Sequence, residues 1–215
     1  PRESTSRILD IGCATGSLAN RLAGDGHVVY GVDTDGEMIR QAIDKKKSQG
    51  FDRYPVFRQM DMTRIDQAIE DHQLDTVICF GNTLVHLKES DAIDRLTQAV
   101  YRLLADDRYF LFQILHYDHI LEHRIRELPL IENDTIRFER RYEYNDHELI
   151  DFVTRLVVKK DGRKVENRIS LYPLRKDQLA TMLKDAGFRE IHFFSSFRKD
   201  ALQSDSMPLV VEALK

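Results

Sequence analysis

The sequence predicts an α/β fold with a seven-stranded, mostly parallel sheet, helices on both faces and a three-stranded antiparallel insert. Over residues 7–115, short apolar runs alternate with amphipathic segments, which is typical of a parallel sheet with right-handed crossovers. After residue 115 three strand-like segments follow one another, which indicates a meander outside that sheet. With 215 residues, 42% hydrophobic and 32% charged, the chain has the size and composition of a single globular domain.

The first part of the chain alternates strand and helix signals. Apolar runs that end in turn residues indicate buried parallel strands, and amphipathic runs between them indicate helices. Asp25-Gly26 and the Asp106-Asp107-Arg108 segment are expected turns. The expected strands are residues 7–11, 27–33, 55–62, 75–80 and 109–115, and the expected helices are residues 17–23, 35–49 and 89–104.

The second part contains the meander and then returns to the main sheet. Asn145-Asp146 and Asp161-Gly162 are turn signals at its two corners, and Asp-Gly in particular is typical of a tight hairpin. Gly187 is expected to end the last helix. The expected elements are a helix at 118–127, insert strands at 135–144, 149–159 and 164–171, a helix at 176–186, and closing strands at 188–196 and 208–214.

A glycine loop follows the first strand. Residues 7–17 read Arg-Ile-Leu-Asp-Ile-Gly-Cys-Ala-Thr-Gly-Ser, with Asp10 at the end of the strand and Gly12 and Gly16 in the loop. A dinucleotide loop has a different glycine spacing and holds a pyrophosphate, which a carboxylate at this point would repel. The same carboxylate pairs well with an ammonium, so the loop predicts a nucleoside ligand with an amino group. The alternative is that both glycines only form a turn.

A second acid follows at the end of the second strand. Asp33 lies about twenty residues beyond the first glycine, where a carboxylate can accept hydrogen bonds from both hydroxyls of a ribose. The alternative is that Asp33 caps the next helix, although Thr34 and Asp35 can supply that cap.

Two segments together resemble a known family. Asp10-Ile11-Gly12-Cys13-Ala14-Thr15-Gly16 resembles motif I of the class I S-adenosylmethionine-dependent methyltransferases, Asp/Glu-x-Gly-x-Gly-x-Gly, with Ala14 replacing the middle glycine. That alanine costs little unless its backbone needs a positive φ. Gly81-Asn82-Thr83-Leu84-Val85-His86-Leu87 is similar to a Gly-Asn-Ser/Thr-x-x-His-Leu segment of the glycine and sarcosine N-methyltransferase branch. The resemblance implies a Rossmann-like fold and S-adenosylmethionine as cofactor.

The resemblance also implies roles for individual residues. An acid at the exit of the third strand receives the adenine amino group in this family, and Asp61 and Met62 match that place. Phe80 and Gly81 would line the cofactor. The implied cofactor-binding residues are Asp10, Gly12, Cys13, Ala14, Thr15, Gly16, Asp33, Thr34, Met38, Asp61, Met62, Phe80 and Gly81.

Asn82 and His86 are the candidate catalytic residues, because the loop after a central strand opens on the carboxyl edge of the sheet, where such sheets bind ligands. A histidine with a near-neutral pKa can serve as a base for a hydroxyl acceptor, while an amine acceptor needs little base. The alternative for His86 is a histidine that only satisfies a neighbouring carbonyl.

The insert, residues 116–173 of a single 1–215 methyltransferase domain, is expected to cover the acceptor side. It begins at the carboxyl end of the fifth strand, so it can wall the acceptor pocket and exclude water. The candidate acceptor-binding residues are His116, Tyr117, Arg168 and Tyr172. Arg168 could instead be a solvated charge, and Tyr172, before Pro173, could simply end a strand.

The composition of the chain limits the kinds of partner that it is expected to bind. The net charge of −4 and the pI near 6.1 argue against nucleic acid, since the chain has no overall basic field. The basic and aromatic run at residues 137–142 is better explained as a half-buried strand with alternating faces. No run is long and apolar enough for a bilayer, the first residues lack a signal-peptide core, and the two cysteines suggest neither a metal site nor disulfides, so we expect a cytoplasmic protein.

We therefore expect an enzyme that transfers the methyl group of S-adenosylmethionine to a nitrogen or oxygen of a small molecule. The alternatives are transfer to RNA or protein, and a non-catalytic subunit that binds the cofactor. Family members usually carry a helical segment before the first strand, and whether such a segment is missing here stays open. The oligomeric state stays open, with a homodimer as one possibility.

Overall fold

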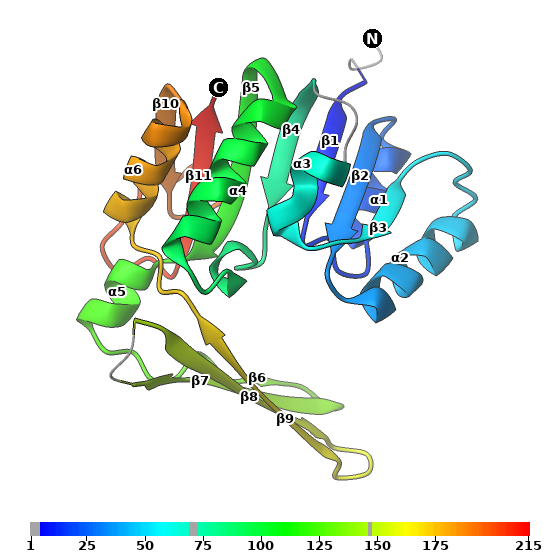
Figure 1. The fold of residues 1–215 in the computed structure, drawn as a ribbon. Helices are drawn as coiled ribbons and strands as arrows, with labels where there is room; N and C mark the ends of the chain where they lie inside the picture. Colours follow the sequence, from blue (N-terminus) through cyan, green and yellow to red (C-terminus); the bar gives the residue numbers. More distant parts are fainter. Residues whose placement is uncertain (1–4, 69–72, 146–147) are drawn as a thin grey trace.

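A seven-stranded sheet forms the body of the molecule, as the sequence predicts (Figure 1). The structure, a computed structural model, describes residues 5–68, 73–145 and 148–215. The strand order is β10-β11-β5-β4-β1-β2-β3, and β11 runs antiparallel to both of its neighbours while the other neighbouring pairs are parallel. The strands are β1 (Arg7–Ile11), β2 (Val28–Asp33), β3 (Val56–Gln59), β4 (Leu74–Cys79), β5 (Leu104–Leu115), β10 (Glu190–Phe194) and β11 (Pro208–Leu214).

Helices cover both faces of this sheet (Figure 1). Alternate residues of a strand point to opposite faces, so β1 sends Ile8 toward one set of helices and Leu9 toward the other. The helices are α1 (Ser17–Gly24) and α2 (Gly36–Ser48) on the first face, α3 (Ile65–Ala68), α4 (Ser90–Leu103) and α6 (Lys176–Ala186) on the second, and α5 (Tyr117–Glu122) after β5. Two 3₁₀ turns, η1 (Met62–Arg64) and η2 (Leu84–His86), follow β3 and β4. Among the described residues, no helix is long and apolar enough to span a membrane.

The start of β5 and the end of α5 differ from the sequence-based expectation. Strand β5 begins at Leu104, so the expected turn at residues 106–108 lies inside the strand. Asp107 there has a φ of 58°, and the β4–β5 register shifts at the same place, so the turn residues form a bulge. Helix α5 ends at Glu122 rather than at residue 127.

The insert is a four-stranded antiparallel sheet rather than the expected three-stranded one. A two-residue strand, β6 (Ile131–Glu132), pairs with β7 (Ile136–Tyr144), and β8 (Ile150–Val158) and β9 (Lys164–Leu171) complete the order β6-β7-β8-β9. The extra strand was missed because two residues carry no periodic signal. The hairpin turn at Asp161-Gly162 is confirmed, whereas Asp146 of the other expected corner lies outside the described residues.

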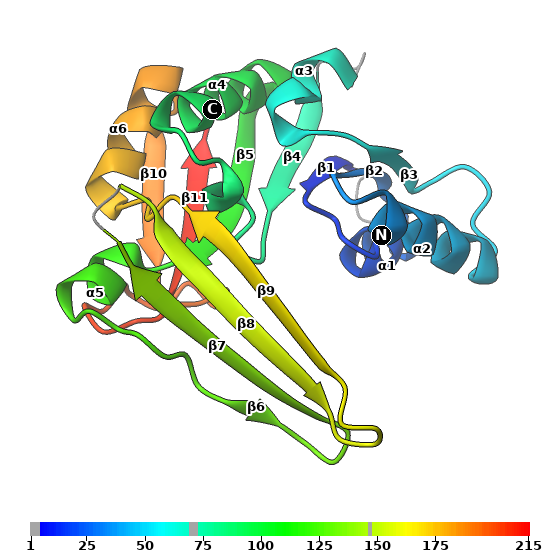
Figure 2. The same cartoon turned by 60° about the horizontal axis from the view of Figure 1, so that its bottom comes forward.

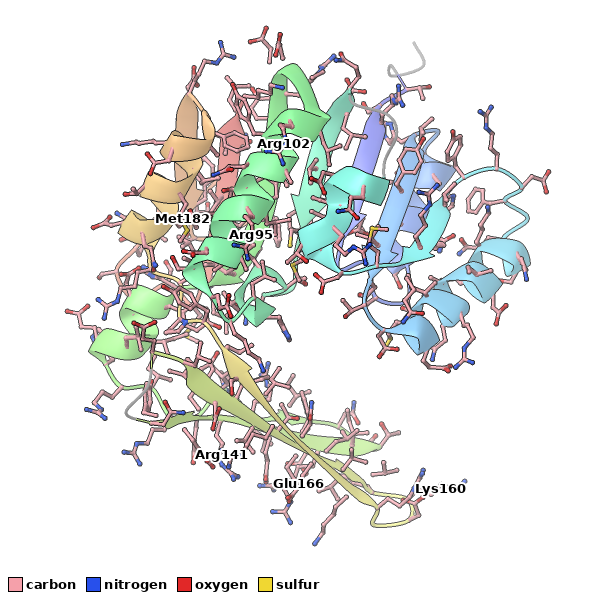
Figure 3. The ribbon with its side chains drawn as sticks, in the orientation of Figure 1. Arg95, Arg102, Arg141, Lys160, Glu166 and Met182 are labelled. Atoms are coloured by element: carbon pink, nitrogen blue, oxygen red, sulfur yellow. The ribbon has the colours of Figure 1, made fainter. Side chains whose placement is uncertain are left out.

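The insert lies at the carboxyl ends of the parallel strands, and its far end projects away from the body (Figures 1 and 2). Its two faces differ as the alternation predicts. The face toward the body carries Tyr142, Ile150 and Leu171, all buried in the main hydrophobic core. The other face carries charged side chains, and Arg141 and Glu166 point away from the body in Figure 3.

Tyr142 is the largest of the insert's buried anchors, at 2% exposure. Burial raises the pKa of its hydroxyl, as does the nearby Tyr117 hydroxyl, and the Tyr142 hydroxyl has no hydrogen-bond partner among the described residues. Its ring therefore contributes packing, while its hydroxyl adds little stability.

We expect Tyr142→Phe to change the free energy of unfolding by no more than about 1 kcal/mol, because only an unpaired hydroxyl is lost. Tyr142→Ala should cost about 3–5 kcal/mol, since it removes a buried ring and leaves a cavity. Denaturant unfolding of both variants checks this. An equal loss in the two variants would show that the hydroxyl, and not the ring, anchors the insert.

Candidate active site

A cavity of about 350 Å³ opens at the carboxyl ends of β1, β2, β3 and β4. Loops after parallel strands build it, which is the usual position of a ligand site in an open α/β sheet. The lining residues are Gly12, Ala14, Val32, Asp33, Thr34, Met60, Met62, Phe80, Gly81, Thr83 and His86. Most of the expected cofactor residues therefore meet at one place.

The glycine loop is held tightly against β2. The N–H groups of Gly12 and Cys13 both donate to the Val32 carbonyl, at 2.8 and 3.0 Å. Gly12 has a φ of 74°, and a Cβ on it would overlap the Thr83 side chain of the loop after β4. Gly16 has a φ of 68°, and a Cβ on it would overlap the Phe57 ring. Glycine is thus required at both positions for conformation and for space.

Ala14, which replaces the family's middle glycine, also adopts a left-handed conformation, with a φ of 46°. The alanine is therefore not free of cost, because this region disfavours a residue with a Cβ by about 1–2 kcal/mol. Its N–H donates to Asp33 Oδ2 at 2.9 Å, and this charge-assisted hydrogen bond helps to hold the conformation.

Asp33 ties the loop to the start of α2. Its Oδ1 accepts from Asp35 N at 3.0 Å, while its Oδ2 accepts from Ala14. Asp35, not Asp33, is the helix cap, because its carboxylate accepts from Glu37 N and Met38 N at 2.8 and 3.2 Å. The Asp33 carboxylate lines the cavity and keeps acceptor capacity for hydroxyl groups of a ligand.

Asp10 lies beneath the glycine loop and is only 4% exposed. Burial, and to a smaller extent the charge of Asp33, raises its pKa to about 7. No lysine or arginine is found among the described residues that line the 350 Å³ cavity. A ligand cation near these two acids would be favoured, and a ligand phosphate would be repelled.

The side of the cavity near β3 is apolar. Met60 and Met62 line it together with Val32, which suits the faces of a planar base. Asp61 accepts from the N–H and hydroxyl of Thr63, both at 2.8 Å, and lines an adjoining pocket that shares Thr34 and Met60 with the cavity. Met60 was not among the sequence candidates, because an apolar residue at a strand end has no distinguishing pattern.

Besides Asp10 and Asp61, four expected cofactor residues do not appear among the described residues that line the cavity. Cys13 is buried and packs in the core under α1 and α2. Thr15 accepts a hydrogen bond from Lys45 Nζ at 3.3 Å, on the side of α2. Gly16 is the residue before α1, and Met38 lies in the first turn of α2. These residues shape the loop and its helices rather than the cavity wall.

The loop after β4 turns through two left-handed residues, Gly81 and Asn82, with φ values of 77° and 65°. The Asn82 amide is engaged at both ends: its Nδ2 donates to Tyr117 Oη at 3.0 Å, and its Oδ1 accepts from Leu115 N at 2.9 Å. Tyr117 is fully buried, and burial raises its pKa to about 12 against the opposing effect of the Asn82 hydrogen bond. The structure thus places Asn82 and Tyr117 in a bridge between this loop, β5 and α5.

His86 lies in η2 at the mouth of the cavity. Burial of part of its ring lowers its pKa below 6.5, and the negative charge of Asp33 opposes that effect. The neutral ring therefore predominates at pH 7 and can accept a proton.

The other three expected acceptor residues lie elsewhere. His116 Nδ1 is 3.1 Å from the Ser206 carbonyl, beside a pocket between α5 and α6. Arg168 pairs with Glu143 and Asp151 on the charged face of the insert, and the Tyr172 hydroxyl accepts from Gln178. The structure does not bring them to the cavity, because each is held by a partner that a linear pattern does not reveal.

Sequence reasoning missed one aromatic side chain at this edge. Phe197, between β10 and β11, is 63% exposed and makes an edge-to-face contact with Phe80, with ring centroids 5.0 Å apart. Such exposure of a phenylalanine beside a cavity is typical of a binding surface. Its sequence signal is a single aromatic in the polar stretch Ser-Ser-Phe-Arg-Lys-Asp.

The part of the chain that forms this cavity matches a known domain family. Residues 8–107 match the family model described as a methyltransferase domain. This stretch contains the glycine loop, both acids and the loop with His86, so the match and the cavity agree on the same residues. The match supports a class I methyltransferase that uses S-adenosylmethionine as its cofactor.

More distant comparisons extend over almost the whole chain. It is 25% identical to a glycine/sarcosine N-methyltransferase of Aphanothece halophytica, over 93% of this chain and 72% of the relative. A glycine/sarcosine N-methyltransferase of Halorhodospira halochloris is 24% identical, over 95% and 73%. The fold is similar to that of an S-adenosylmethionine-dependent methyltransferase from Clostridium acetobutylicum, with a TM-score of 0.83, 18% identity, and coverage of 98% of this chain and 85% of the other.

The cavity suits this cofactor in its chemistry. Two acids, and no lysine or arginine among the described residues that line the cavity, match a ligand with an ammonium and no phosphate. We propose that Asp33 holds the ribose hydroxyls, that Asp10 faces the methionyl ammonium, and that Met60, Met62 and Asp61 surround the adenine.

If Asp33 binds the ribose, Asp33→Ala should weaken S-adenosylmethionine binding by about 1.5–3 kcal/mol, roughly 10- to 150-fold in Kd. Asp33→Asn keeps one acceptor oxygen and should lose less. Asp35→Asn is the matched control, since asparagine caps a helix as well as aspartate does. Calorimetric titration measures all three. Full affinity in Asp33→Ala would mean that the ribose is held elsewhere.

Proposed function

We propose that this methyltransferase acts on a small molecule and transfers the methyl group to a nitrogen or oxygen, with an amine nitrogen as the first candidate. The observation that carries the proposal is the cavity mouth, where a neutral histidine and an exposed aromatic ring lie beside an acidic cofactor site. The amine is favoured because the relatives in the comparison are named for methylation of glycine and sarcosine.

The insert supports a small acceptor. It stands at the carboxyl edge of the main sheet (Figure 2). Tyr172 N at its end donates to Val85 O of η2 at 2.9 Å. No insert residue is found among the described residues that line the cavity, so the insert does not fill it. We propose that the insert covers the acceptor, as the far wall of a pocket whose near wall is η2.

Nucleic acid is a poorer candidate for the acceptor. Arginines on the charged face of the insert are paired with acids: Arg137 with Glu139, Arg141 with Glu143, and Arg155 with Glu166. Paired charges release few counterions on binding a phosphate backbone, and the net charge of −4 gives no attraction at a distance.

The chain's own groups have defined tasks in this reaction. When bound, S-adenosylmethionine supplies an electrophilic methyl group on a sulfonium sulfur. The glycine loop and Asp33 fix its position, and the Asn82 bridge holds the loop that carries His86. His86 accepts the proton that the acceptor nitrogen or oxygen loses as the new bond to carbon forms. Phe197 and Phe80 exclude water from the acceptor side.

A labelled-methyl assay tests the substrate class. The protein is incubated with S-adenosylmethionine labelled in its methyl group and with separate metabolite, RNA and protein fractions. We expect label in the metabolite fraction. Label in RNA or protein alone would overturn the small-molecule assignment.

His86→Ala should lower kcat by about a hundredfold or more if His86 is the base, and leave cofactor affinity nearly unchanged. Because a base must be unprotonated, the wild-type rate should fall as the pH drops below the lowered pKa of His86 and should level off above it. His192→Ala, which changes an exposed histidine of β10, is the control. A small loss of kcat without a change in the pH profile would limit His86 to shaping the pocket.

A further inference from the structure

The insert ends in a strand whose outer edge is open. Strand β9 pairs with β8 on one side and, among the described residues, with no strand on the other. Figure 2 shows it at the free edge of the insert, beyond the body of the molecule. Residues 164–168 are all exposed, and Val165 is 57% exposed. Such an edge offers unpaired N–H and C=O groups to another strand.

The sequence of β9 is complementary to itself. Residues 164–170 read Lys-Val-Glu-Asn-Arg-Ile-Ser, with Asn167 at the centre. If a second copy pairs antiparallel about Asn167, Glu166 stands opposite Arg168 and Val165 stands opposite Ile169, each twice. Opposite charges and apolar residues are the cross-strand pairs that stabilise a sheet.

Neighbouring registers lack this complementarity. Centring the pair on Glu166 puts two glutamates face to face and sets Lys164 against Arg168, and centring it on Arg168 puts two arginines face to face. Centring it on Val165 uses only three residues of each strand. A shift by one residue would join the charged face of one copy to the apolar face of the other.

The charged face of the insert already has the pattern that this pairing continues. Glu139, Arg155 and Glu166 lie side by side on β7, β8 and β9, with ion-pair distances of 3.8 and 3.4 Å. The row of alternating charges stops at Glu166, at the open edge (Figure 3). Arg168 of a second copy would be the next member of the row.

We propose that two copies of this chain associate through β9, antiparallel and centred on Asn167, into one eight-stranded sheet. Two short paired strands bury less area than the roughly 1,600 Å² of a standard interface. We therefore expect a weak dimer, with a Kd on the order of 10–100 µM. Ser170 then stands opposite the second copy's Lys164. The β8–β9 hairpin of that copy therefore lies near Tyr172, which is bonded to η2.

Cysteine cross-linking tests both the contact and its register. In the proposed pairing the two Asn167 residues face each other, at a Cα distance of about 4.5–5.5 Å that a disulfide can span. The two Val165 residues lie four positions out of register, about 13 Å apart along the strand. The native cysteines, Cys13 and Cys79, are both buried.

Under mild oxidation, Asn167→Cys should form a covalent dimer, while Val165→Cys and the wild type should not. A dimer of Val165→Cys alone would overturn the register, and equal cross-linking of both variants would indicate random collision and overturn the interface. Circular dichroism of each variant confirms that it is folded. No cross-link in folded Asn167→Cys at high protein concentration would overturn the proposal.

Charge reversal supplies an independent measurement. Glu166→Arg places an arginine opposite the second copy's Arg168 at both symmetry-related positions, so sedimentation velocity should show a dimer dissociation constant raised at least tenfold. Glu132→Arg makes the same change in net charge on β6, at the opposite edge of the insert, and should leave the dimer intact. Equal effects of the two variants, or a wild type that is monomeric throughout, would contradict the interface.

Discussion

The carboxylate of Asp33 holds the site together. One oxygen fixes the N–H of the left-handed Ala14 and the other fixes the N–H of Asp35 at the start of α2. The glycine loop is thus bound to β2 by a side chain as well as by the Val32 carbonyl. The position of the loop in turn depends on Gly12, which leaves room for Thr83 and so lets the loop after β4 approach. Asp33 therefore joins the loops after β1 and β2 directly, and Gly12 lets the loop after β4 pack against them.

Charge accounts for the choice of ligand. Asp10 and Asp33 lie close enough for the charge of one to raise the pKa of the other, and Asp10 is withdrawn from water. This arrangement is unfavourable for the protein alone, since a buried carboxylate without a cation loses its hydration. A bound ammonium relieves it. We regard this unfavourable pair of acids as the reason that the cavity suits a cationic nucleoside rather than a nucleotide.

Local signals in the sequence predicted most of the fold. Strand β9, helix α6 and strand β11 have the expected bounds, because their periodicity and end residues are local properties. Strand β6 was not predicted because its two residues carry no periodic signal, and the early start of β5 was not predicted because pairing with the distant β4 defines it. The acids and the glycines of the loop could be found from spacing. The engagement of Asn82 with Tyr117 and Leu115, and the contact of Phe197 with Phe80, could not, because more than thirty residues separate the partners.

The pH dependence of cofactor affinity tests the central claim most directly. If Asp10 has a pKa of about 7 in the free protein and faces the ammonium in the complex, binding releases its proton. Calorimetry should then show S-adenosylmethionine binding about tenfold more tightly at pH 7 than near pH 5.5, a difference that Asp10→Asn removes, and no comparable binding of NAD. An affinity that is independent of pH in the wild type, or NAD bound as tightly as S-adenosylmethionine, would contradict the account.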